Sequence, residues 1–180
     1  MDAQTRRTAQ VAREIGHDCL AVRVRLLNRA VTRIYDTALR PHGLTIAQLN
    51  LLASIANRQP APAGELARLL SMEISTLSRN ARLLEADGLI QIERAEHGNG
   101  RILTLTDAGA KKLAKLRPAW HTAQGRAQAL LGDDAAESIR QLVDGMFAEQ
   151  LTSEQPEPSP QALASPATMR TPSVASAAHP

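Results

Sequence analysis

Short hydroxyl side chains and arginines gather in one stretch of this 180-residue sequence, and a further arginine follows beside a glycine. Hydroxyls near a helix N-terminus approach phosphates and base edges closely, and a guanidinium can donate two parallel hydrogen bonds to guanine. An arginine on a mobile hairpin suits a narrow minor groove. This pattern favours contacts with double-stranded DNA. The candidate contact residues are Ser75, Thr76, Ser78, Arg79, Arg82 and Arg101.

No comparable set of residues in the sequence points to catalysis. Gly98 and Gly100 fall in a predicted hairpin rather than between a strand and a helix, so they do not form a phosphate-binding loop. No histidines are paired four residues apart and no Cys-x-x-Cys occurs. The adjacent Asp133 and Asp134 suit a helix N-terminus better than acid–base chemistry. We therefore expect neither enzymatic activity nor a cofactor or metal.

Composition indicates a helical, intracellular protein. Aromatic residues make up only 2% of the chain and hydrophobic residues 43%, so aliphatic side chains must build the core, and sheets that stack RNA bases are excluded. The single cysteine, Cys19, cannot form an intramolecular disulfide. The N-terminus lacks the apolar core of a secretory signal, and no apolar run is long enough to span a membrane. We expect a cytoplasmic location.

The elements that must position the candidate residues can be read from apolar periodicity. Apolar residues three and four apart predict one long helix over 8–40, and Thr45 and Gln48 form a capping box that starts the next helix. Two short helices follow, over 63–70 and 73–86, and the apolar face of the second is Ile74, Leu77, Ala81 and Leu84. Period-two alternation predicts strands 89–93 and 102–106. Two more helices are expected over 107–131 and 135–151.

A helix pair with a hairpin directly behind it is typical of a winged helix-turn-helix. The predicted fold is mainly α with a small β-hairpin wing, flanked by N- and C-terminal dimerisation helices. The expected parts are a dimerisation helix (1–43), the winged helix-turn-helix (44–106), C-terminal dimerisation helices (107–151) and a disordered Pro/Ser/Ala tail (152–180). In the alternative interpretation, the hydroxyls are helix caps and the arginines a solvated face.

The long helices carry more apolar surface than a small winged domain can cover. A second copy of the chain would bury that surface symmetrically, so we expect a homodimer. A monomeric helical subdomain is the alternative.

The stretch LARLLSMEISTLSRNARLLEADGLI, residues 66–90, resembles the recognition segment of MarR-family transcriptional regulators. Asn99-Gly-Arg101 and Leu103 to Gly109 are similar to that family's wing and following strand. The resemblance implies an obligate dimer that reads a pseudo-palindromic operator. It also implies a repressor that a small phenolic ligand or an oxidant releases from DNA. The family usually has Asp where this chain has Asn99, which predicts a more loosely held wing.

The resemblance also suggests where a signal could act. In the peroxide-sensing branch a cysteine of the first helix is oxidised beside tyrosines, and Cys19 and Tyr35 fall near those positions. A buried or dimer-packing role is favoured for Cys19, because its register is shifted by about two residues and a second tyrosine is missing. His42 could line a ligand cavity or sit in a loop, and Trp120 could be a pocket wall or part of the core.

Charge leaves a second function open. The net charge is +3, but residues 58–101 hold six basic and six acidic side chains. A helical dimer whose winged domain binds a protein partner is therefore the alternative to a DNA-binding regulator. Arg101 at a glycine-flanked wing favours DNA, since a protein-binding module has no need for it.

Overall fold

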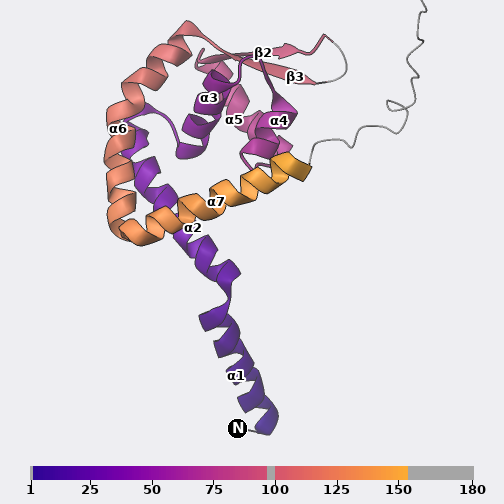
Figure 1. Ribbon diagram of the computed structural model, residues 1–180, viewed down its shortest axis with the longest axis vertical. Helices are drawn as coiled ribbons and strands as arrows, with labels where there is room; N and C mark the ends of the chain where they lie inside the picture. Colours follow the sequence, from indigo (N-terminus) through magenta and orange to yellow (C-terminus); the bar gives the residue numbers. More distant parts are fainter. Residues whose placement is uncertain (1, 97–99, 154–180) are drawn as a thin grey trace, which may run out of the picture. The chain divides into compact units, whose positions relative to one another are not determined.

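The computed structural model describes residues 2–96 and 100–153. Contacts group the chain into two compact units, Met1–Asp133 and a second unit from Asp134 onward. The described chain is mostly helical with one small antiparallel sheet, which confirms the predicted fold class (Figure 1). None of its helices is long and apolar enough to cross a membrane. The expected boundaries after residues 43 and 106 stay predictions, and most of the expected tail lies outside the described residues.

The prediction of a single N-terminal helix over 8–40 is wrong, because the structure has two helices there. Helix α1 covers Ala3–Asp18, α2 covers Leu20–Leu39, and Cys19 between them is extended. Residues 16–19 are Gly, His, Asp and Cys, which all have weak helix propensity. The guanidinium of Arg23 donates two hydrogen bonds to the carbonyl of His17, which stabilises the end of α1.

The middle of the first unit runs through a 3-10 turn (η1, Arg40–His42), α3 (Ile46–Asn57), β1 (Ala61–Pro62), α4 (Ala63–Leu69), α5 (Ile74–Ala86), β2 (Ile90–Arg94) and β3 (Arg101–Leu105). The predicted capping box is confirmed: Thr45 accepts from the amide of Gln48, whose side chain accepts from the Thr45 amide at 2.9 Å. The sheet has the order β1-β3-β2, so the expected hairpin gains a third, two-residue strand.

The core of this part is aliphatic, as the scarcity of aromatic residues predicts. Leucine and isoleucine side chains from several helices and both wing strands meet in it, and they exclude water almost completely. The largest fully buried side chains are Leu39, Leu51, Leu52, Ile55, Leu66, Leu77, Leu84, Ile90, Leu103 and Leu116. Because α3, α5 and the wing strands share this core, the wing and α5 are held in one rigid arrangement.

Helix α6 (Asp107–Leu131) is locked to the wing at its start. Thr106 caps it by accepting from the amide of Gly109 at 3.0 Å, and its hydroxyl donates to the carbonyl of Gly88 at 2.7 Å. A Cβ at Gly109 would lie 2.1 Å from the carbonyl oxygen of Leu89, so only glycine fits there. The helix then runs along α2 (Figure 1). The hydroxyl of Tyr35 on α2 donates to the side-chain carbonyl of Gln124 on α6.

The last helix, α7 (Asp133–Ser153), begins two residues before its predicted start. Arg140 forms a 2.8 Å ion pair with Glu137 one turn before it, and this contact lowers the pKa of the Glu137 carboxyl. Large apolar side chains of this helix are exposed: Ile139, Leu142, Val143 and Met146.

Candidate nucleic-acid interface

The joint between α4 and α5 is a tight turn built on a left-handed residue. Ser71 has φ +49°, a conformation that costs a non-glycine residue about 1–2 kcal/mol. The amide of Met72 closes the turn by donating to the carbonyl of Ala67 at 2.8 Å. Helix α5 starts two residues later, so the joint fixes its direction relative to α4.

Helix α5 presents one face to the core and leaves a wide polar surface in solvent. Leu77, Ala81 and Leu84 are buried, as predicted. Ile74 is 52% exposed, so its predicted burial is wrong. It is the first residue of the helix, and because helical side chains lean toward the N-terminus, its side chain extends beyond the turn that the core covers.

Four of the candidate contact residues line one recess on this helix. The recess measures about 470 Å³ and is lined by Ser75, Ser78, Arg79, Arg82 and Leu83. Thr76 is exposed but lies outside the lining, and its carbonyl accepts from the side-chain amide of Asn80 at 3.1 Å. The structure therefore brings the two serine hydroxyls and the two arginines of α5 together in one recess, with Leu83 among them.

The polar groups in this recess are available for an external partner. Glu73 is the N-cap residue of α5 and makes no side-chain cap bond, so the hydroxyls of Ser75 and Ser78 are not caps. Within the described residues, neither these hydroxyls nor the guanidiniums of Arg79 and Arg82 form a hydrogen bond or ion pair. Burying them without a partner would be costly, so an exposed, unpaired set of this kind suits a polyanionic ligand.

The wing places a second arginine beside the predicted one. Arg94 on β2 pairs directly with Arg101 on β3, and both line a recess of about 310 Å³ with Glu85, Ile92 and Glu93. Like charges at paired positions repel, and the two guanidiniums share their recess with the carboxylates of Glu85 and Glu93. Arg94 was not predicted because the expected first strand ended at residue 93. Extending the predicted strand pairing by one residue beyond Glu93 places Arg94 opposite Arg101. Asn99 lies outside the described residues.

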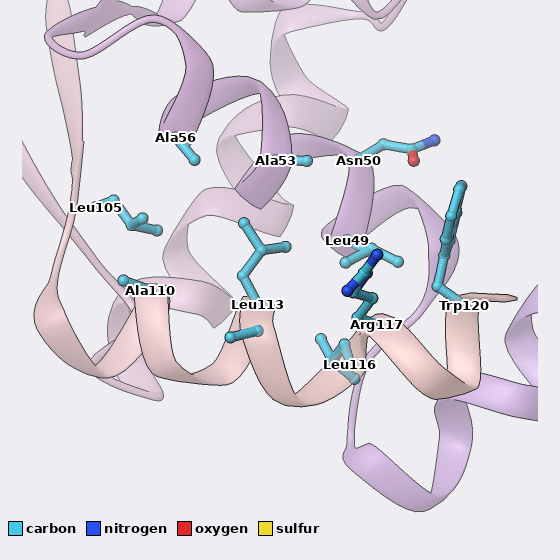
Figure 2. Close-up of a pocket in the computed structure, with 11 residues that line it drawn as sticks. Leu49, Asn50, Ala53, Ala56, Leu105, Ala110, Leu113, Leu116, Arg117 and Trp120 are labelled. Atoms are coloured by element: carbon cyan, nitrogen blue, oxygen red, sulfur yellow. The ribbon is translucent and has the colours of Figure 1, made fainter.

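A large apolar cavity, open to solvent, lies between α3 and α6. It measures about 670 Å³ and is lined mostly by alanine and leucine: Leu49, Asn50, Ala53, Ala56, Leu105, Ala110, Leu113, Ala114, Leu116, Arg117 and Trp120. Figure 2 shows the polar groups at one end, where Asn50, Arg117 and Trp120 stand, and Ala56, Leu105 and Ala110 at the other. Alanines spaced three or four residues apart on both helices leave this space, and that spacing was the signal in the sequence.

A smaller cavity adjoins the first, and two of the predicted signal residues meet there. Its volume is about 290 Å³, and Tyr35 and Trp120 line it together; Asn50 and Trp120 border both cavities. Burial raises the pKa of the Tyr35 hydroxyl above its ordinary value.

The other two predicted signal residues lie elsewhere. Cys19 precedes Tyr35 by sixteen residues, which is about 24 Å along a helix, so one protomer does not bring them together. His42 is exposed on η1, and its carbonyl accepts from the Lys112 ammonium at 2.6 Å. Neither lines the two cavities described above.

Known proteins are similar to this chain over the helix-turn-helix and the wing. The MarR family model matches residues 42–101, which contain α3 to the wing. The solved structure of the M. tuberculosis transcriptional regulator MosR in complex with DNA is 30% identical, with a TM-score of 0.61; the match covers 73% of this chain and 98% of that one. No curated protein matched the sequence.

Two further solved structures have the same fold. A probable transcriptional regulator from Pseudomonas aeruginosa is 25% identical, with a TM-score of 0.63, over 72% of this chain and 97% of that chain. A mutant E. coli MarR complexed with operator DNA is 20% identical, with a TM-score of 0.64, over 74% and 96%. With the family match on the helix-turn-helix and wing, and near-complete coverage of MosR, the chain belongs to the MarR family of transcriptional regulators.

Proposed function

We propose that this protein is a dimeric, DNA-binding transcriptional repressor that a small phenolic ligand releases from its operator. The observation that carries the proposal is the recess on α5, which two serine hydroxyls and two guanidiniums line without a hydrogen-bond or ion-pair partner among the described residues. It lies on the second helix of a helix-turn-helix, the element that enters the DNA major groove in such folds.

In this proposal α5 and the wing contact different parts of the duplex. Arg79 and Arg82 donate to base edges or phosphates in the major groove, and Ser75, Thr76 and Ser78 approach the backbone. Arg101 enters the minor groove, and Arg94 beside it neutralises a phosphate. The neutral charge balance of residues 58–101 is compatible with the assignment of α5 because the acidic side chains of the segment do not line the α5 recess; Glu85 and Glu93 line the wing recess instead.

The proposed dimer uses the helices outside the winged domain, residues 1–43 and 107–151. Leu20 on α2 is 77% exposed and Leu142 on α7 is 68% exposed, and further aliphatic side chains on both helices lie in solvent. Surfaces of this kind are costly in water and are stabilised by burial against a symmetric partner. A two-fold dimer presents two copies of α5, which matches a pseudo-palindromic operator.

Ligand release is proposed to act through the α3–α6 cavity. Its apolar walls suit an aromatic or aliphatic body, and Arg117 and Asn50 at one end suit a single anionic or hydroxyl group, as in small phenolic compounds. Helix α3 packs on α5 through the shared core, so a ligand that favours a different α3–α6 spacing also changes the position of α5. Cys19 is less suited to this role because it lines neither cavity, so an oxidant is the second candidate signal.

The test has two stages. The purified protein is first used to select duplexes from a randomised DNA pool, and binding of the enriched duplex is measured by fluorescence anisotropy against a scrambled one. Phenolic carboxylates are then titrated into the complex, in parallel with the variant Ala53→Phe, whose larger side chain fills the cavity. We expect release from DNA for the unmodified protein and none for the variant. If no duplex is enriched, DNA binding is refuted and the protein-partner alternative gains support.

A further inference from the structure

One apolar side chain interrupts the polar surface of α5. Leu83 is 51% exposed and lines the same recess as Ser75, Ser78, Arg79 and Arg82. It follows Arg79 by one helical turn, so the two side chains are neighbours on the helix surface. A single exposed leucine elsewhere on the surface would need no explanation, but Leu83 lies among polar groups that have no partner in the part of the chain that the structure describes.

The chemistry of a DNA groove supplies one apolar group for such a side chain. Among the four bases only thymine carries a methyl group on its major-groove edge, and aliphatic side chains contact that methyl directly. A guanidinium next to the aliphatic group would contact the neighbouring base pair. We infer that Leu83 is a specificity residue that contacts the 5-methyl group of a thymine, beside the base pair that Arg79 contacts. This inference rests on the proposed function.

The size of the effect follows from the area that one methyl group removes from water. Burial of a single methyl-sized group is worth about a fourfold change in binding constant for each half-site. Replacing that thymine by deoxyuridine removes the methyl and keeps every hydrogen-bonding group of the base. The substitution therefore isolates the apolar contact from the polar ones.

The experiment replaces each thymine of the selected operator by deoxyuridine and measures binding of three proteins by anisotropy. For the unmodified protein, one position in each half-site should lose about fourfold in affinity. Leu83→Ala removes the contact from both half-sites, so it should bind the thymine operator about 16-fold more weakly and should not respond to deoxyuridine at that position. Leu83→Met, which keeps an apolar side chain of similar volume, should retain the response.

Ile74→Ala is the matched control, because Ile74 is equally exposed on the same helix but does not line the recess. The Ile74→Ala variant should keep the loss of affinity on deoxyuridine substitution at the thymine that Leu83 contacts. The inference is overturned if no thymine responds in the unmodified protein, or if Leu83→Ala responds as strongly as the unmodified protein does. Specific operator binding without the response would overturn this inference alone, whereas failure to enrich any operator would overturn the proposed function as well. Thermal unfolding of each variant verifies that it is folded.

Discussion

Replacement of Arg79 by alanine separates the reading of DNA from the stability of the fold. The Arg79 guanidinium is exposed and, in the described chain, has no hydrogen bond or ion pair. Its truncation should therefore change the free energy of unfolding by no more than about 0.5 kcal/mol. A bidentate contact to a base is worth about 1–3 kcal/mol, and a dimer makes it twice. The operator affinity should fall at least about 30-fold.

The assay is anisotropy with the operator and with each of its single-base variants. The unmodified protein should discriminate strongly at one base pair in each half-site, and Arg79→Ala should lose that discrimination. Lys111→Ala removes one positive charge from an exposed position on α6, outside the helix-turn-helix, and controls for net charge. If Arg79→Ala keeps both the affinity and the base preference, then α5 is not the recognition helix.

Three further variants test other parts of the structure. Arg101→Ala should weaken binding to all duplexes similarly and reduce the slope of log affinity against log salt by about one per protomer; an unchanged slope, measured at four salt concentrations, would contradict a phosphate or minor-groove contact. Gly109→Ala should lower the free energy of unfolding by about 1–3 kcal/mol in urea titrations, because its Cβ would meet the Leu89 carbonyl; a neutral result would mean that the start of α6 is not tightly packed there. Tyr35→Phe should cost about 0.5–1.5 kcal/mol, and the loss should disappear in a Gln124→Ala background if the hydrogen bond between α2 and α6 is its cause.

Local signals predicted much of the fold. The capping box at Thr45 and the cap at Thr106 each depend on residues three positions apart, so the sequence alone identifies them. The hairpin and the buried face of α5 follow from periodicity. The break at Cys19 does not follow from apolar periodicity, because it depends on the weak helix formers at residues 16–19. The strand at Ala61–Pro62 is too short to show a period and exists only because it pairs with β3.

The candidate site was predictable in part. The hydroxyls and arginines of α5 are close in sequence, and helical geometry brings most of them to one recess. Exposure of Ile74 depends on where the core ends, which periodicity does not specify. The α3–α6 cavity joins residues more than fifty positions apart, and its volume depends on tertiary packing. For that reason Arg117 and Asn50 could not be recognised as its polar end.

The most direct test of the central claim is a comparison of two duplexes at two salt concentrations. Fluorescence anisotropy would measure binding of the purified protein to an operator selected from randomised DNA and to a scrambled duplex of the same composition. The operator should bind at least about 1,000-fold more tightly than the scrambled duplex, and both affinities should fall steeply as salt rises. Equal, weak binding to both duplexes at both salt concentrations would contradict it.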